Sequence, residues 1–450
     1  LIALAAGLAT IPQWHNVQDG GAFTTVAGMV GIDGFALFAT ATICAAVFLA
    51  VLFLDGYLVR EDLVGIEPFV LLLISASGAI VMASANDLII MFLGLEIMSI
   101  AAYVLAGLHI RRARSGEAAL KYFVLGGLSS AFFLYGIALV YGATGSTHLA
   151  TIADYLAANA FSNDLLLLAG MMMMIVGFGF KVAAVPFHQW TPDVYQGAPT
   201  PITGFMASAV KIGGFVGFLR VFTMAFDTYQ LDWQIPVYVI AILTLLVGSV
   251  FSLVQTDVKR LLAYSSINHA GFILVALEQA SPEGTSAALF YLVAYSFMVL
   301  GSFGVVGLLS RRGDGHNALD DYAGIASKEP VLAFLLTVFL LAQAGVPFTV
   351  GFVAKFEVLM AAVEGGAWPL ALIAMVTAVI AAFLYLKVIV AMYSGTLSDK
   401  VAALPKVLIP WGAKLALVIA FVMVVGLGIV PGPVTNLAEH ATPHLIALGK

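Results

Sequence analysis

The sequence predicts an all-α, polytopic transmembrane helix bundle, and two observations on composition lead to that fold class. Only 10% of the 450 residues are charged, whereas an ordinary soluble protein carries roughly 25%. The hydrophobic share is 62% and the mean hydropathy is +1.05. So few charges cannot cover a water-exposed surface, which excludes a soluble globular protein. A net charge of −6 without any basic block also excludes a nucleic-acid-binding protein.

Twelve stretches are long enough to cross a bilayer, which takes about 20 apolar residues per helix. They are apolar on all sides, which indicates helices, because a helix satisfies its own backbone hydrogen bonds in lipid. Residues 1–10 are apolar but too short to cross. We interpret them as part of a helix rather than as a signal remnant, since no basic region or cleavage signature precedes them. The twelve stretches are 34–55, 67–85, 87–108, 116–141, 164–198, 202–226, 234–255, 258–279, 285–310, 331–361, 369–393 and 409–431.

Two of these stretches are longer than one crossing and contain a proline near the middle. Pro186 lies in 164–198 and Pro347 lies in 331–361, within the similar segments AVPF and GVPF. Proline removes an amide donor and breaks or kinks a helix. Inverted repeats that each contain a broken helix are a transporter design, and the breaks point to the transport site. We therefore predict a broken helix at each proline.

The two broken helices suggest two inverted five-helix repeats. A second pair of similar segments, AALKY at 118–122 and AALFY at 287–291, supports this interpretation. An odd number of helices per repeat turns the second copy upside down in the membrane. The expected organisation is N-terminal helices at 1–66, a first repeat at 67–226, a second repeat at 227–393, and a C-terminal helix and tail at 394–450.

The loops are charged on one side only, which predicts the orientation of the chain. Alternate loops carry eleven basic residues, whereas the loops between them, such as 11–33, 142–163 and 280–284, carry none. Positive loops face the cytoplasm, so the C-terminus, with only Lys450 in its tail, is expected on the opposite face. The eleven residues are Arg60, Arg111, Arg112, Arg114, Lys259, Arg260, Arg311, Arg312, Lys328, Lys400 and Lys406.

A few ionisable residues remain inside the spans. An ionisable group at mid-bilayer costs at least about 2.5–3.5 kcal/mol, so such residues mark functional sites or structural pairs. We favour a functional role for Glu96 and Lys211, which lie near the centres of their spans, and a snorkelling or paired role for Arg220, Lys387 and Lys414. The full set is Glu96, Lys121, Lys181, Lys211, Lys355, Glu357 and Lys387, with Arg220 and Lys414 nearer helix ends.

Two of these lysines lie beside the predicted breaks. Lys181 precedes Pro186 by five residues, and Lys355 follows Pro347 by eight. A broken helix exposes backbone groups that can hold water at membrane depth. Burial lowers the pKa of a lysine from about 10.4 and a nearby carboxylate raises it again, so a moving carboxylate can load or release a proton. The hypothesis is that Glu96 modulates Lys181 and that Lys211 and Lys355 continue the proton path.

Two histidines are candidates for the same path. His188 lies beside the first break, and His269 lies in the middle of a span. A neutral imidazole can relay protons near physiological pH, but it can equally be a structural group bonded between helices, and both roles stay open. Neither histidine has a Cys or carboxylate at ligand spacing, so no metal site is expected. The only cysteine, Cys44, cannot form a disulfide within the chain.

Residues 179–199 read GFKVAAVPFHQWTPDVYQGAP, and at this segment the chain resembles the antiporter-like subunits of respiratory complex I, in particular the subunit N branch. The DVYQGAP motif separates that branch from subunits L and M. Agreement covers almost the whole chain, and it includes GLE at 94–96, KY at 121–122, AVKI at 209–212, KRLLAYSS at 259–266 and GFVAKF at 351–356.

The resemblance implies a fold and a set of functional residues. Bacterial members have fourteen helices, so the first helix and part of the second would be absent here. The family's glutamate at Glu96 pairs with the lysine at Lys181, and its lysines at Lys211 and Lys355 continue a central hydrophilic axis, the last nearest the periplasmic exit. The family lysine that matches Lys121 is thought to connect the glutamate to the neighbouring subunit.

The resemblance also implies the setting in which the chain works. It implies a proton-translocating membrane-arm subunit of NADH:quinone oxidoreductase in the bacterial inner membrane, between subunits K and M and under a lateral helix from subunit L. NAD, FMN, iron–sulfur clusters and quinone would be bound by other subunits, and this chain would bind no cofactor and perform no redox chemistry. One alternative is a subunit of a multisubunit sodium/proton antiporter, and another is a purely structural scaffold.

Overall fold

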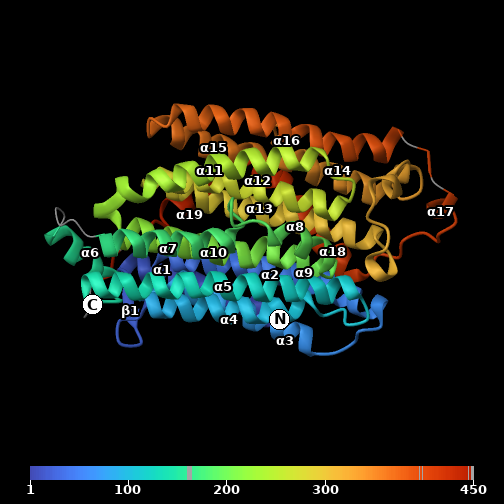
Figure 1. The fold of residues 1–450 in the computed structure, drawn as a ribbon. Helices are drawn as coiled ribbons and strands as arrows, with labels where there is room; N and C mark the ends of the chain where they lie inside the picture. Colours follow the sequence, from blue (N-terminus) through green and yellow to red (C-terminus); the bar gives the residue numbers. More distant parts are fainter. Residues whose placement is uncertain (160–164, 395, 398, 444, 447–450) are drawn as a thin grey trace.

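The computed structural model describes residues 1–159, 165–394, 396–397, 399–443 and 445–446, with the side chains of 399 and 400 left aside. Lys450 and the side chain of Lys400, both used above to predict orientation, therefore lie outside the described residues. The described chain is a helix bundle with one small antiparallel hairpin, formed by β1 (Phe23–Thr25) and β2 (Val30–Ile32). Figure 1 shows most helices running along one common direction.

Eleven helical segments among the described residues are long and apolar enough to cross a membrane, which confirms the predicted fold class. One of them is a continuous stretch made of α9 (Thr200–Phe205), the π-helical turn η1 (Met206–Val210), α10 (Lys211–Arg220) and the π-helical turn η2 (Val221–Ala225). The others are α2 (Gly34–Glu61), α3 (Glu67–Ser84), α4 (Leu88–Ala106), α5 (Ala113–Thr144), α7 (Leu165–Val182), α11 (Gln230–Leu253), α12 (Val258–Glu278), α13 (Pro282–Leu309), α16 (Trp368–Ser394) and α18 (Trp411–Ile429).

Both prolines break their helices where the sequence predicts. The first span divides into α7, which ends at Val182, and the short helix α8 (Trp190–Gly197). The second divides into α14 (Pro330–Ala344) and α15 (Val350–Glu364). The remaining short helices are α1 (Ile2–Gly20), α6 (Leu149–Ala158), α17 (Asp399–Ala402), α19 (Gly432–Glu439), and the 3-10 turns η3 (Asp227–Tyr229), η4 (Arg312–Asp314), η5 (Leu319–Tyr322) and η6 (Ile325–Ser327).

The first helix is longer than its apolar residues suggest. The sequence predicts a loop over 11–33, but α1 continues to Gly20 before the hairpin begins. No glycine interrupts residues 8–19, and the helix ends where Gly21 adopts φ 82°, a conformation that glycine reaches without strain. The polar residues after residue 10 therefore extend the helix rather than end it.

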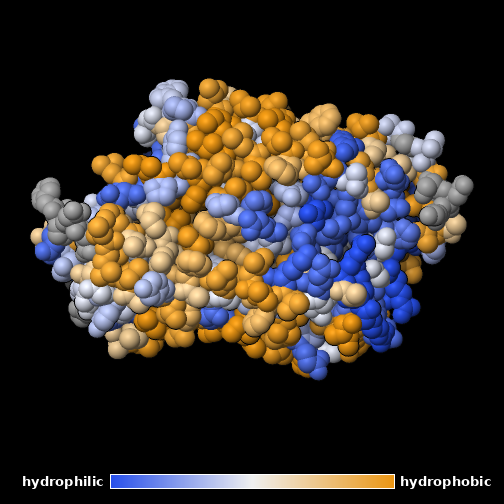
Figure 2. Space-filling model, in the orientation of Figure 1, coloured by the Kyte–Doolittle hydropathy of each residue, from blue (hydrophilic) through white to orange (hydrophobic). Residues whose placement is uncertain are grey.

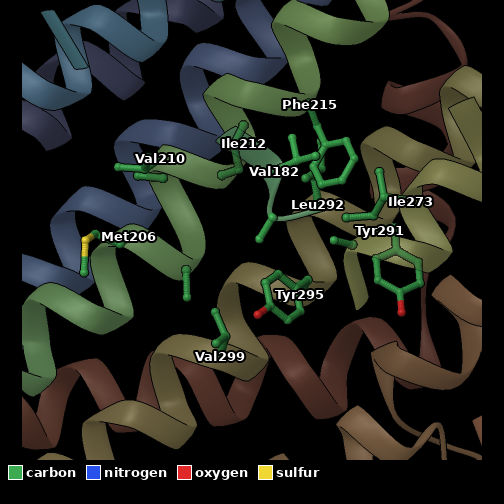
Figure 3. Close-up of a cluster of buried hydrophobic side chains, with 14 of the residues drawn as sticks. Val182, Met206, Val210, Ile212, Phe215, Ile273, Tyr291, Leu292, Tyr295 and Val299 are labelled. Atoms are coloured by element: carbon green, nitrogen blue, oxygen red, sulfur yellow. The ribbon is translucent and has the colours of Figure 1, made fainter. Parts of the chain in front are cut away.

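Three segments form the centre of the bundle. In the most apolar part of Thr200–Ala225 and of α12, every residue is buried, and in that of α13 94% are buried. In α16 and in α18 only 33% of the corresponding residues are buried. Figure 1 shows α10, α12 and α13 lying between the α3–α5 group and the α11–α16 pair. Figure 3 shows the apolar core between them, including Ile212, Ile273 and Leu292. Any ionisable group on these segments is therefore removed from lipid and from bulk water.

The same kind of glycine contact brings together the first two helices of each expected repeat. A Cβ on Gly78 of α3 would lie 2.6 Å from the carbonyl oxygen of Gly94 on α4. A Cβ on Gly248 of α11 would lie 2.5 Å from the backbone nitrogen of Asn268 on α12. Only glycine permits helix backbones to approach this closely.

The basic loops meet at one end of the bundle. This is the arrangement expected if they lie on the same side of the membrane. The carboxylate of Asp314, between α13 and α14, lies 3.0 Å from Arg112, 3.5 Å from Arg60 and 3.9 Å from Lys259. Lys328 donates to backbone carbonyls of Val401 and Ala402 at the same end. Figure 2 shows hydrophilic residues gathered at one end and hydrophobic residues covering most of the remaining face.

Candidate functional site

Lys211 lies in the centre of the bundle, at the first position of α10 and directly after the π-helical turn η1. A π-helical turn adds a residue to the helix and often occurs where a side chain must be aimed at a functional site. The side chain is 2% exposed. Its Nζ donates to the backbone carbonyl of Ser266 at 2.7 Å and contacts Ser266 Oγ at 2.6 Å. The prediction that Lys211 is a buried central lysine is confirmed.

His269 lies one helical turn beyond Ser266 on α12, and hydroxyl groups contact both of its ring nitrogens. Nδ1 lies 2.7 Å from the hydroxyl of Tyr291, and Nε2 lies 3.2 Å from the hydroxyl of Tyr385. The Tyr385 hydroxyl in turn lies 2.6 Å from Ser265 Oγ. A neutral imidazole between two hydroxyls can accept a proton on one nitrogen and release one from the other. The geometry allows relay through this histidine.

Lys355 lies on α15 and reaches back across the second break. Its Nζ donates to the backbone carbonyls of Gln343 and Ala344, each at 2.9 Å. These are the last two residues of α14, whose terminal carbonyls have no amide partner in their own helix. The break therefore creates the acceptors that hold the lysine.

Gln343 connects this second lysine to α12. Its Oε1 accepts a hydrogen bond from Ser265 Oγ at 3.1 Å, and its Nε2 donates to Ser302 Oγ at 2.6 Å. Ser265 adjoins Ser266, which holds Lys211, and it also contacts Tyr385 next to His269. Polar groups of α12 thus lie between the central lysine and the lysine of the second break.

Lys181 lies in the last turn of α7 and is 3% exposed. Its Nζ donates to Ser99 Oγ at 2.7 Å and to the Tyr122 hydroxyl at 3.4 Å. The aliphatic part of the Lys181 side chain packs against Gly214 of α10. A Cβ added at Gly214 would lie only 3.2 Å from Lys181 Cγ. Gly214 is one helical turn from Lys211, so the glycine lets the helices that carry the two lysines approach closely.

Glu96 lies one turn before Ser99 on α4. In the described part of the chain no ion pair within 4.0 Å joins Glu96 to Lys181, and the buried Oε1 of Glu96 has no hydrogen-bond partner. Ser99, which the sequence gave no reason to select, occupies the position at Lys181 that the family resemblance led us to expect for the carboxylate.

Lys121 is placed differently from the sequence prediction. We expected it at membrane depth, but its side chain is 41% exposed and pairs with Glu117 and Asp193, each at 2.7 Å. Asp193 also binds Arg260 at 2.6 Å. Lys121, Glu117 and Asp193 line a cleft of about 210 Å³. The reason is that α5 begins at Ala113, so Lys121 lies only two turns from the polar end of the bundle.

The other candidates do not join this chain of contacts. His188 lies partly exposed in the turn between α7 and α8, and no hydrogen bond among the described residues links it to the buried lysines. Arg220 forms a fully buried ion pair with Asp33 at 2.6 Å. Lys387 donates to carbonyls near the end of α11, at Leu253 and Gln255. The paired, structural interpretation of Arg220 and Lys387 agrees with these contacts.

The structure adds several polar residues that the sequence did not single out. They are serines, tyrosines and one glutamine, and only the glutamine is unusual in an apolar span. Because serine and tyrosine are common in membrane helices, sequence alone gives no signal for them. The residues are Ser99, Tyr122, Ser265, Ser266, Tyr291, Gln343 and Tyr385.

The described residues contain no group of three or more His, Cys, Asp or Glu side chains arranged to hold a metal ion. Cys44 is a buried free thiol. The ionisable and polar groups at this site are the amines, the imidazole, the carboxylate and the hydroxyls described above. All of them are suited to holding and passing protons.

A multi-span helix bundle with two broken helices and buried ionisable residues between them defines an ion-translocating membrane protein. The family described as NADH:quinone oxidoreductase/Mrp antiporter, transmembrane part, matches residues 85–381, and the chain belongs to this family. Among curated relatives, "NADH-quinone oxidoreductase subunit N" of Trichlorobacter lovleyi is 43% identical, over 87% of this chain and 79% of its own length. The subunit of that name from Mycobacterium tuberculosis is 47% identical, over 84% of this chain and 72% of its own.

Solved structures agree with the family assignment. A chain of respiratory complex I from Thermus thermophilus, solved with bound aureothin, is 34% identical and has a TM-score of 0.80, with 97% of this chain and 93% of that chain covered. A chain of the Mrp complex from Dietzia sp. has a TM-score of 0.86 at 19% identity, covering 98% and 90%. At that identity the second match shows the fold alone.

Proposed function

We propose that this chain is a proton-translocating membrane-arm subunit of NADH:quinone oxidoreductase, and that its protons pass along Lys181, Lys211, His269 and Lys355. The observation that carries the path is the set of polar contacts that α12 makes between Lys211 and Lys355. Family membership and the relatives named subunit N support the assignment to this enzyme complex. The chain contributes proton movement, and the redox cofactors NAD, FMN, iron–sulfur clusters and quinone are assigned to other subunits.

The first step takes place between Glu96, Ser99 and Lys181. A serine hydroxyl both accepts and donates hydrogen bonds, and Ser99 accepts from Lys181 while it donates its own proton to the backbone carbonyl of Leu95. Glu96, one turn away with an unpartnered carboxylate oxygen, is the group whose protonation or displacement would change the charge at Lys181. Lys181 then passes its proton toward Lys211 on the adjoining α10.

The second step takes the proton from Lys211 across α12. Ser266 and Ser265 stand between the two lysines, and His269 with its two tyrosine partners extends the line. Lys355 is the last buried lysine. Two residues further along α15, Glu357 lines an open cleft of about 320 Å³ with Glu283, Glu364 and Glu439, opposite the basic loops. We propose that the proton leaves toward this acidic face.

The repeat organisation and the partners are part of the same proposal. Residues 67–226 and 227–393 would be the two inverted repeats, and their broken helices would place Lys181 and Lys355 in corresponding roles. The basic loops would face the cytoplasm and the C-terminus the periplasm. Subunits K and M would flank the chain, a lateral helix from subunit L would lie across it, and Lys121 in its exposed cleft would connect the path to a neighbour.

A subunit of a multisubunit sodium/proton antiporter is the second candidate, because the Mrp chain shares the fold. The relatives named subunit N, at 43–47% identity over more than four fifths of this chain, favour the NADH-linked complex. The two candidates differ in what drives transport. NADH oxidation should drive proton uptake by vesicles that contain the assembled complex, and this uptake should persist without sodium.

The test replaces single residues in the assembled complex and compares proton uptake with NADH oxidation in vesicles. Glu96→Gln and Lys211→Met should each lower the number of protons moved per NADH oxidised. Lys387→Met is the matched control, because it also removes a lysine from a membrane helix but lies outside the path. Wild-type pumping in Glu96→Gln would refute the role of the carboxylate. Wild-type pumping in Lys211→Met would favour a purely structural scaffold.

A further inference from the structure

A groove at the basic end of the bundle lies away from the lysine path. It has a volume of about 400 Å³ and lies between α2, α13 and the segment that leads into α18. Its floor is apolar and includes Phe53, Phe303, Leu308 and Ala413. Four basic residues line its mouth, namely Arg60, Arg311, Arg312 and Lys406. The groove is therefore apolar inside and positively charged at its opening.

Carboxylates pair with two of these four basic residues, and none of those carboxylates lines the groove. Arg60 is paired with Glu61 at 2.9 Å, and Arg311 with Glu329 at 3.4 Å. Arg312 and Lys406 are exposed, and among the described residues neither side chain has an ion-pair partner within 4.0 Å. At least two positive charges at the opening are thus available to a ligand.

Two apolar side chains beside these charges are exposed. Leu408 is 91% exposed and Val59 is 67% exposed, and both line the groove. An exposed apolar patch next to unpaired cations is unfavourable in water, but it matches a ligand that has both acyl chains and an anionic group. Because the groove lies where spanning helices end, that ligand has the polarity of the membrane itself.

We infer that the groove binds one anionic phospholipid. Its phosphate would lie between Arg312 and Lys406, and its acyl chains would run over Phe53, Phe303 and Leu308. The charge complementarity favours an anionic lipid over a zwitterionic one, since basic residues near the membrane surface attract anionic headgroups. The lipid would join α2, α13 and α18, and so hold the C-terminal helix onto the bundle. This binding follows from membrane insertion and does not depend on the proposed proton path.

The test uses the assembled complex after removal of loosely bound lipid with detergent. Mixed micelles with phosphatidylglycerol should raise its thermal unfolding temperature, and micelles with phosphatidylcholine should not. In the double variant Arg312→Gln/Lys406→Gln the apparent affinity for phosphatidylglycerol should fall roughly tenfold or more, at about 1 kcal/mol per lost charge. A charge-matched control, Arg111→Gln/Lys414→Gln, removes two exposed basic residues that do not line the groove and should bind as the parent does.

A second pair of variants tests the same mouth without removing an arginine. Leu408→Glu places a negative charge among the cations and should weaken binding, whereas Leu408→Asn should bind more tightly than the glutamate variant. Unchanged affinity in both the double variant and Leu408→Glu would overturn the proposal. So would full stabilisation by inorganic phosphate alone, which would make this a free-anion site. A photo-crosslinker at position 408 that captures a neighbouring polypeptide instead of lipid would also overturn it.

Discussion

The two lysines beside the helix breaks are held by different kinds of partner. Lys181 in the first half of the chain donates to side-chain hydroxyls, those of Ser99 and Tyr122. Lys355 in the second half donates to the backbone carbonyls of Gln343 and Ala344. A hydroxyl can accept a proton from one side and release one on the other, whereas a carbonyl only accepts a hydrogen bond. The hydroxyl pocket, formed by Ser99 and Tyr122, can therefore take part in proton transfer. The carbonyl pocket, formed by the backbone of Gln343 and Ala344, positions Lys355.

The difference follows from where each lysine stands relative to its break. Lys181 is in the last turn of the helix before the break, so its side chain reaches neighbouring helices α4 and α5. Lys355 is in the helix after the break and reaches back to the free carbonyls of α14. A side-chain pocket can be removed by one substitution, but a carbonyl pocket changes only when the backbone changes. The following predictions use this contrast.

The largest effect is expected from Pro347→Ala. In a continuous helix the amide of residue 347 would bond to the carbonyl of Gln343, which Lys355 now occupies. An alanine supplies that amide and competes with the lysine, and leaving a buried charge unpaired costs roughly 3 kcal/mol. The rate of proton pumping should fall about a hundredfold, since about 1.4 kcal/mol corresponds to tenfold in rate. Pro330→Ala, at the first turn of α14, is the control and should pump normally.

Ser99→Ala should have the next largest effect, because it removes the hydroxyl that contacts Lys181. A hydrogen bond to a charged group contributes roughly 1.5 kcal/mol or more, so we expect about a tenfold loss of proton pumping. Ser99→Thr retains a hydroxyl and should restore most of the rate. Ser75→Ala removes another buried serine, whose hydroxyl donates to the backbone carbonyl of Met98 rather than contacting a lysine, and should pump as the parent does. Equal losses in both alanine variants would point to a packing effect and contradict the role of Ser99.

Gly345→Ala should disturb the carbonyl pocket more gently. Gly345 has φ +90°, and a Cβ there would lie 3.0 Å from Lys355 Cδ. The backbone strain is of the order of 1 kcal/mol, and we expect about a fivefold loss of pumping as the lysine moves. Gly366→Ala carries similar strain at φ +81° but would meet nothing within 4 Å. Comparing the two variants separates displacement of the lysine from loss of stability, measured as thermal unfolding of the complex.

These contrasts also show what sequence could and could not predict. Charge scarcity, span lengths and the two prolines predicted the bundle, both breaks, and the burial of Lys181, Lys211 and Lys355. Sequence could not predict Ser99 as the partner of Lys181, because a serine in a membrane helix is too common to be informative. It also could not locate the carbonyls that hold Lys355, since they belong to the backbone and depend on how α15 folds back against α14.

The placement of Lys121 at membrane depth was predicted incorrectly for a related reason. Hydropathy indicated a span over 116–141, but α5 begins at Ala113 and its first turns are polar, with Glu117 and Lys121 facing a cleft. Hydropathy averages over a window and does not report the depth of a single side chain. A lysine near the end of a span can therefore be predicted as buried although its side chain is exposed.

The smallest effect is accordingly expected from Lys121→Gln. Its pairs with Glu117 and Asp193 are exposed to solvent, and pairs of this kind contribute about 0.2–1 kcal/mol. Proton pumping should fall about twofold at low salt, and the difference from the parent should shrink in 0.5 M salt, where the Debye length is roughly half of its value at physiological ionic strength. A salt-independent loss as large as that of Lys211→Met would show that Lys121 acts inside the proton path, and it would place the entrance at the Asp193 cleft rather than at Glu96.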